Sequence, residues 1–136
     1  MGIVRGSHRG PLYSLRDSNG AWTGALSDQE VEETDLSRVR WLAGPRGSIT
    51  VHSCRAVHGS KANLSPRMRP LLLHTYAPAD DVPLTRIMDP VRFANIIVRG
   101  APATRARFSE EPCPMPPNWG AGEYKSIFSA QQEKVG

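Results

Sequence analysis

Cysteine is scarce in this chain, and long apolar runs are absent. The 136 residues include two cysteines, Cys54 and Cys113, which are far apart and form no Cys-x-x-Cys pair. This excludes a disulfide framework and predicts free thiols in a reducing compartment. No stretch approaches the ~20 apolar residues of a membrane-spanning helix, and residues 1–8 contain no apolar signal core. The sequence therefore predicts a cytoplasmic protein with no membrane partner.

Features of regular secondary structure are also few. Twelve glycines, twelve prolines and 39% hydrophobic residues indicate a loop-rich chain. Its length is close to that of one common domain. Four prolines between Pro112 and Pro117 exclude a regular helix or a central strand there. We therefore expect residues 1–100 to form the body of the domain and residues 101–136 to form a Pro-rich tail that wraps over it.

Acidic residues are fewer than basic ones. The chain has 17 basic and 13 acidic residues and a net charge of +4. The sequence shows neither the basic stripe nor the binding motif of a nucleic-acid-binding protein, so no nucleic-acid partner is predicted. A basic pocket for small anions fits the charge at least as well. The arginines are scattered along the sequence and include Arg5, Arg9, Arg16, Arg38, Arg40, Arg67, Arg69, Arg105 and Arg107.

What the chain does contain is a series of short apolar or alternating segments. Each is typical of a short strand bounded by turn residues, and the series comprises residues 1–6, 38–43, 48–54, 70–76 and 93–98. Ser27 and Glu30 have the spacing of a capping box and predict a short helix from about Asp28 to Thr34. A second short helix or turn is expected at 84–88. The pattern predicts a mainly β fold, either a β-sandwich or a jelly roll.

One segment concentrates residues with chemical function. His58 begins the run His-Gly-Ser-Lys-Ala-Asn-Leu-Ser-Pro-Arg-Met-Arg, which ends at Arg69 and continues into the apolar segment 70–76. If residues 48–58 are extended, His52 and His58 point to the same side. An imidazole can bind a metal, and a guanidinium can bind both oxygens of a carboxylate. Arg67 is the alternative to Arg69, and the apolar run favours Arg69 as the buried arginine.

A complete metal site is not evident in this sequence. The residues two positions after the four histidines are Gly10, Cys54, Ser60 and Tyr76, so no His-x-Asp or His-x-Glu pair occurs. An alternative set would combine His52 or His74 with one of the acids Asp17, Asp80 and Asp81. Their spacing does not require this arrangement.

The run from His58 to Arg69 resembles the distal half of the active site in phytanoyl-CoA dioxygenase-like, Fe(II)- and 2-oxoglutarate-dependent oxygenases. The spacing of eleven residues between His58 and Arg69 matches the family pattern. Other segments resemble the family too. Arg5-Gly6-Ser7-His8 is similar to its Pro-Gly-Ser-His element, residues 47–51 to the strand before the distal histidine, and residues 71–80 to the strand after it.

The resemblance implies a partial double-stranded β-helix (jelly roll) with long loops and a short helix. It implies that His58 is a metal ligand and that Arg69 and Ser60 bind the cofactor 2-oxoglutarate. The family's His-x-Asp pair precedes the Gly-Ser-His element, so it is expected upstream of Met1, and the chain is expected to be a C-terminal part. His8 belongs to that element and is not taken as a ligand.

Two functions are therefore expected. The first is a dioxygenase (hydroxylase) that uses Fe(II) and 2-oxoglutarate to oxidise a small-molecule substrate once the other half of the metal site is supplied. The alternative is a non-catalytic fragment or pseudoenzyme that binds a partner. An open sheet edge would accept either a second copy, giving a dimer, or a complementing chain.

Overall fold

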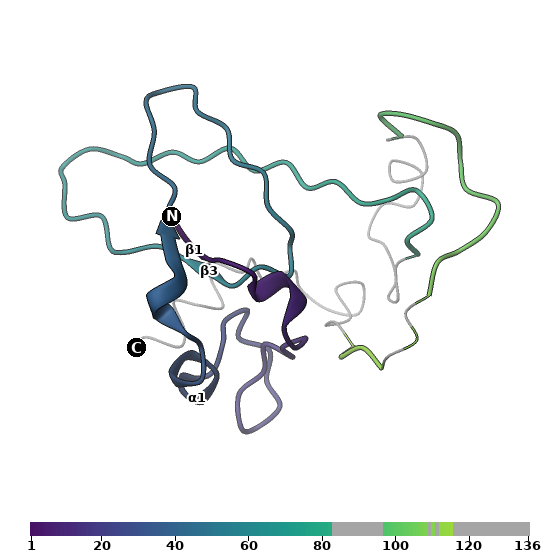
Figure 1. Ribbon diagram of the computed structural model, residues 1–136, viewed down its shortest axis with the longest axis horizontal. Coiled ribbons are helices and arrows are strands. Elements are labelled where there is room, and N and C mark those ends of the chain that lie inside the picture. Colours follow the sequence, from purple (N-terminus) through teal and green to yellow (C-terminus); the bar gives the residue numbers. More distant parts are fainter. Residues whose placement is uncertain (83–96, 109, 111, 116–136) are drawn as a thin grey trace. The chain divides into compact units, whose positions relative to one another are not determined.

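The computed structural model describes residues 1–82, 97–108, 110 and 112–115 (Figure 1). They fall into two compact units: residues 1–13 with 26–72, and residues 14–25 with the described residues from 73 onward. The predicted turn at 84–88, most of the predicted strand 93–98 and the tail from residue 116 lie outside the described residues. None of the helices formed by the described residues has the length and apolar character needed to cross a membrane.

A three-stranded antiparallel sheet organises the first unit. Strand β1 (Gly2–Val4) lies between β2 (Val39–Trp41) and β3 (His58–Gly59). Two residues of β1 pair with both neighbours: Gly2 with Trp41 and Gly59, and Ile3 with Arg40 and His58. The strands predicted within residues 1–6 and 38–43 are therefore confirmed.

The register gives the sheet two chemically different faces. Residues directly opposite each other in an antiparallel pair point to the same side, and side chains alternate along each strand. The pairing continues past β1, where the Arg5 amide donates to the Arg38 carbonyl at 3.2 Å. One face thus carries the residues Ile3, Arg40 and His58, and the other carries Gly2, Val4, Val39 and Trp41.

The buried core of this unit is small. Val4 and Ala56 are the buried hydrophobic residues of the described chain, at 7% and 6% exposed. Trp41 covers Gly2 so closely that a Cβ added there would lie 3.0 Å from its ring. On the outer side of that ring, the Lys61 ammonium lies 4.9 Å from the centroid, a cation–π geometry. Glycine at position 2 is thus what lets the indole lie flat on the sheet.

Short helical turns connect the strands. They are the 3-10 helices η1 (Ser7–Arg9) and η2 (Leu36–Arg38) and the α-helix α1 (Asp28–Glu32). The predicted capping box at α1 is confirmed. The Glu30 amide donates to Ser27 Oγ at 3.3 Å, and the Ser27 amide donates to the Glu30 carboxylate at 2.6 Å. These reciprocal bonds satisfy backbone donors that the first turn of a helix leaves free.

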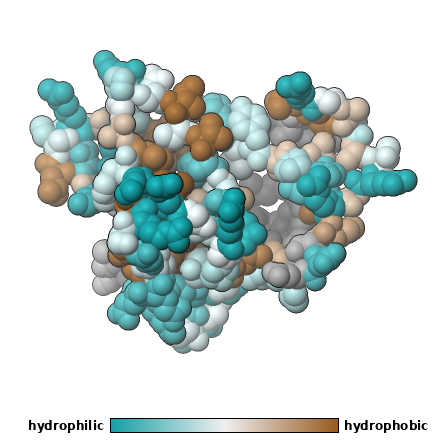
Figure 2. Space-filling model, in the orientation of Figure 1, coloured by the Kyte–Doolittle hydropathy of each residue, from teal (hydrophilic) through white to brown (hydrophobic). Residues whose placement is uncertain are grey.

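Two predicted strands are not strands in the structure. Residues 48–54 and 70–76 contain no strand and expose their apolar side chains, with Val51 at 94% and Leu72 at 81%. Figure 2 shows hydrophobic side chains exposed at the surface. A strand is stabilised by backbone hydrogen bonds to a neighbour and by burial of one face, and neither segment has such a neighbour among the described residues. The structure is mostly non-helical with one small sheet, and a jelly roll is not confirmed.

In the second unit, two local contacts stand out. Residues 16–22 form a turn in which Arg16 and Trp22 are bridged antiparallel, and Asp17 Oδ1 accepts from the Ala21 amide at 2.8 Å. Further along the chain, the Arg107 guanidinium donates to Asp80 Oδ2 at 3.0 and 2.8 Å. This second contact is an ion pair between partly exposed side chains, so its contribution to stability is small.

Candidate functional site

His58 is positioned by strand β3 and by a hydrogen bond to its own backbone segment. Its Nδ1 lies 2.8 Å from the carbonyl oxygen of Ala56. A carbonyl oxygen only accepts, so this bond requires the proton on Nδ1. The neutral ring then carries its lone pair on Nε2. Metal-binding histidines commonly have this arrangement, in which the second nitrogen donates to a carbonyl.

His52 lies beside His58, which the parity of residues 48–58 did not predict, because an extended segment would hold two residues six positions apart ~20 Å from each other. The two ring centroids are 5.4 Å apart and the ring planes are inclined by 57°. His52 Nδ1 is buried and has no hydrogen-bond partner among the described residues. The structure thus brings the two histidines together, and residues 48–54 do not form the predicted strand.

Ser7 joins β1 to the segment that carries His58. Its hydroxyl donates to the Val4 carbonyl and accepts from the Val57 amide, both at 2.8 Å. The turn that presents Ser7 begins at Gly6, whose φ of +82° is a left-handed conformation. A Cβ at Gly6 would also lie 2.6 Å from the Arg38 guanidinium. The Gly-Ser-His element therefore holds β3 in register and is itself shaped by Arg38.

The loop after His58 is organised by Asn63. Its Nδ2 donates to the Arg67 carbonyl at 2.7 Å, and its Oδ1 accepts from the Ser65 hydroxyl at 2.8 Å. Arg69 Nη1 donates to the Lys61 carbonyl at 3.2 Å and closes the loop.

The expectation that Arg69 is the buried arginine is wrong for this structure, in which both Arg69 and Arg67 are exposed. The reason is that the apolar run after Arg69, expected to carry it into a core, is itself exposed. Ser60 is exposed too and directly follows β3.

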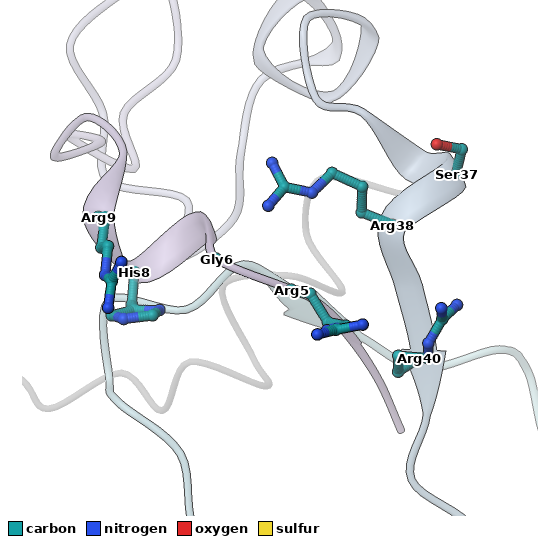
Figure 3. A pocket seen from close by; sticks show the side chains of 7 residues that line it. All are labelled: Arg5, Gly6, His8, Arg9, Ser37, Arg38 and Arg40. Atoms are coloured by element: carbon teal, nitrogen blue, oxygen red, sulfur yellow. The ribbon is translucent and has the colours of Figure 1, made fainter.

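A pocket of about 520 Å³ lies next to the sheet, lined by residues that directly follow β1 and by residues of η1, η2 and β2 (Figure 3). Its lining is dominated by cationic side chains and contains no carboxylate: Arg5, Gly6, His8, Arg9, Ser37, Arg38 and Arg40. In the sequence these arginines are scattered over 36 positions. The signal that could have grouped them is their register, because the Arg5 amide is bonded to the Arg38 carbonyl just beyond β1.

Comparison with known proteins decides the family. Residues 1–71 match the phytanoyl-CoA dioxygenase (PhyH) family. This chain belongs to the PhyH family. A curated relative from Stutzerimonas stutzeri, described as a probable alpha-ketoglutarate-dependent hypophosphite dioxygenase, is 33% identical over 118 residues. The match covers 85% of this chain and 41% of the relative, so the chain spans less than half of that relative's length. No solved structure matches the chain.

The described residues of this PhyH-family chain supply part of a metal site. His58 fits as one ligand, because its Nδ1 is hydrogen-bonded and its Nε2 is left for coordination. The described residues contain no group of three His, Cys, Asp or Glu side chains that could hold a metal ion. The predicted alternative sets with Asp17 or Asp80 are not formed there. Asp80 pairs with Arg107, and Asp17 accepts from the backbone of its own turn.

Proposed function

We propose that this PhyH-family chain carries the distal part of an Fe(II)- and 2-oxoglutarate-dependent dioxygenase site. His58 is the metal ligand, and Arg69 with Ser60 binds 2-oxoglutarate. The observation that carries the proposal is the 2.8 Å hydrogen bond from His58 Nδ1 to the Ala56 carbonyl, because it leaves Nε2 as the coordinating atom. The family and the 2-oxoglutarate-dependent relative support the same reaction class.

In this site the chain's own groups have separate tasks. His58 presents a neutral nitrogen in a fixed orientation, and β3 and Ser7 hold the backbone that carries it. The Arg69 guanidinium pairs with the cofactor's distal carboxylate through two of its five N–H groups, and a further N–H on Nη1 donates to the Lys61 carbonyl. The Ser60 hydroxyl donates to the same carboxylate.

Bound iron would supply the activation of dioxygen, coupled to oxidation of 2-oxoglutarate to succinate and CO2. Non-haem Fe(II) oxygenases hold the ion with two histidines and one carboxylate. In this proposal the remaining two ligands come from outside the described residues. The substrate is a small molecule, and hypophosphite is the first to test because the curated relative is named for it.

The test is an anaerobic titration with Fe(II) and then with 2-oxoglutarate, followed by calorimetry, of a form of the protein that also contains the remaining two ligands. We expect His58→Ala to abolish iron binding. We expect Arg69→Gln to weaken 2-oxoglutarate at least tenfold, about 1.4 kcal/mol, while iron affinity is retained. Arg67→Gln is the matched control, since it removes the same charge two residues away. If Arg67→Gln abolishes 2-oxoglutarate binding and Arg69→Gln does not, the assignment of Arg69 is wrong.

A second candidate function, binding of a partner protein without catalysis, is favoured by one observation. Strands β2 and β3 are the outer strands of the sheet, and neither has a second neighbour among the described residues. An unpaired edge is a template for another strand. Under this alternative the wild-type chain binds no Fe(II), and light scattering detects a dimer or a complex with a co-purifying chain. Iron binding by a monomer would exclude it.

A further inference from the structure

The cationic pocket is built by fixed backbone positions. Arg5, Arg38 and Arg40 line the same pocket, because the Arg5 amide is bonded to the Arg38 carbonyl just beyond β1 and Arg40 follows on β2. His8 and Arg9 come from η1, which follows the left-handed turn at Gly6 (Figure 3). The side chains are therefore held together by the sheet register and by one turn.

Among the described residues, no guanidinium group of this pocket forms an ion pair, and Arg38 interacts with the charge of Asp35 only at longer range. The Arg40 guanidinium has one weak contact, from Nη1 to the Val39 carbonyl at 3.4 Å. The ion pair that the structure shows is Arg107 with Asp80, in the other unit. The nearest acid in sequence, Asp35, uses Oδ1 to accept from the Ser37 amide and hydroxyl at 3.1 and 2.6 Å. Asp35 does not line the pocket.

Such a cluster is unfavourable unless something compensates it. Like charges directly opposite on neighbouring strands are destabilising, typically by ~0.2–1 kcal/mol per pair. Arg5 and Arg38 lie next to each other just beyond the paired residues of β1 and β2, and Arg9 and Arg40 add two further positive charges to the same pocket. A bound anion would turn this repulsion into attraction. Arginine is the side chain best suited to it, since its planar fork matches the oxygens of phosphate or carboxylate.

We infer that this pocket binds a phosphorus oxyanion with two negative charges, either free phosphate or the phosphate or phosphonate group of a small organic molecule. Four guanidiniums without a lining carboxylate favour a dianion over a single carboxylate. The volume of about 520 Å³ lies within the roughly 300–1,000 Å³ of small-molecule sites. The pocket therefore has room for more than the oxyanion alone.

The pocket also shares a sheet face with His58. Arg40, Ile3 and His58 form one row across the three strands, and two strand spacings place the outer members ~10 Å apart. A small molecule whose oxyanion occupies the pocket can therefore extend toward His58. Its use as a substrate rests on the proposed function, whereas the binding of the oxyanion does not.

The test is a calorimetric titration of the metal-free chain in low-salt, phosphate-free buffer. The probes are inorganic phosphate, phenylphosphonate and acetate. We expect phosphate and phenylphosphonate to bind at one site and acetate to bind at least tenfold more weakly. The double variant R5Q/R38Q should raise the phosphate Kd at least tenfold. The matched control R46Q/R99Q also removes two positive charges, at exposed positions outside the pocket. It should change the phosphate Kd less than twofold.

The outcomes distinguish free phosphate from an organic ligand. They also distinguish a failure of this inference from a failure of the proposed function. Tighter binding of phenylphosphonate than phosphate indicates an organic ligand, and equal binding indicates free phosphate. If R46Q/R99Q weakens phosphate as much as R5Q/R38Q, or if a single-stranded oligonucleotide displaces phosphate with a steep salt dependence, the inference is overturned. His58→Ala should leave phosphate binding intact. Loss of iron binding with phosphate binding retained would therefore be a failure of the proposed function alone.

Discussion

The segment that begins at Gly2 and the segment from Pro70 to Tyr76 make an instructive comparison. Both are apolar, and both are predicted strands. The first became β1, hydrogen-bonded on both sides, with Val4 at 7% exposure. The second has no strand structure and exposes Leu71, Leu72 and Leu73 at 65%, 81% and 71%. Apolar composition thus does not make a strand by itself, because the backbone donors and acceptors need a neighbour.

The difference predicts where the chain is sensitive to substitution. Truncating Val4 to Ala removes buried methyl groups and should lower the free energy of unfolding by about 2 kcal/mol. Leu72→Ala, a larger truncation at an exposed position, should change it by less than ~0.5 kcal/mol. Urea unfolding followed by circular dichroism measures both. Equal effects of the two variants would mean that residues 70–76 are buried in solution and that the comparison fails.

The next largest effect is expected at the serine that joins β1 to the His58 segment. Ser7→Ala removes the acceptor of the Val57 amide and leaves that donor unpaired in a partly buried place. We expect a loss of about 1–2 kcal/mol. Ser18→Ala, at an exposed turn position, is the control and should be neutral. Amide hydrogen exchange at Val57 provides a local readout, and unchanged protection in Ser7→Ala would contradict the role assigned to Ser7.

Two glycines sharpen the comparison further, because they share a backbone conformation but not an environment. Gly6 and Gly47 have φ of +82° and +86°. A Cβ at Gly6 meets the Arg38 guanidinium, whereas nothing lies within 4 Å of one at Gly47. Each Ala substitution should cost about 1 kcal/mol for the left-handed conformation. Gly6→Ala should cost about 1 kcal/mol more for moving Arg38, measured by the same urea titration. Equal costs would show that Arg38 does not lie against Gly6.

The smallest effect concerns a purely local contact at the turn before β2. The pKa of Asp35 is lowered below its ordinary value of 3.8, mainly by the hydrogen bond from the Ser37 side chain and in part by Arg38. A lowered carboxyl pKa stabilises the fold above pH 3.8, and this contribution is lost as the pH falls through the lowered value. The melting temperature of Asp35→Asn should therefore lie slightly below that of wild type near pH 6 and converge with it in stronger acid. A difference in melting temperature that persists in acid would mean that the ionised Asp35 carboxylate is not the cause of the difference.

Local signals in the sequence were reliable for the helix start and for two short strands, but not for residues 48–54 and 70–76. The capping box at Ser27 and Glu30 was predicted from spacing and is formed, because its contacts span three residues. The strand containing Ile3 and Val4 was also predicted and is formed, whereas the proximity of His52 to His58 depends on a chain path that alternation did not predict. The burial predicted for Arg69 was wrong, since it depended on residues 70–76 finding a partner. The assignments of His58, Ser60 and Arg69 remain predictions.

The sequence by itself determined the family, through the run from His58 to Arg69 and the Gly-Ser-His element. It also determined the chemical types available at the site, since no pattern of contacts can add an imidazole or a guanidinium. The tertiary structure decided which of these groups meet. It placed Arg5 next to Arg38 and put Arg40 and His58 on the same face. The physical reason is that register depends on pairing between distant segments, and the linear order of residues does not fix which segments pair.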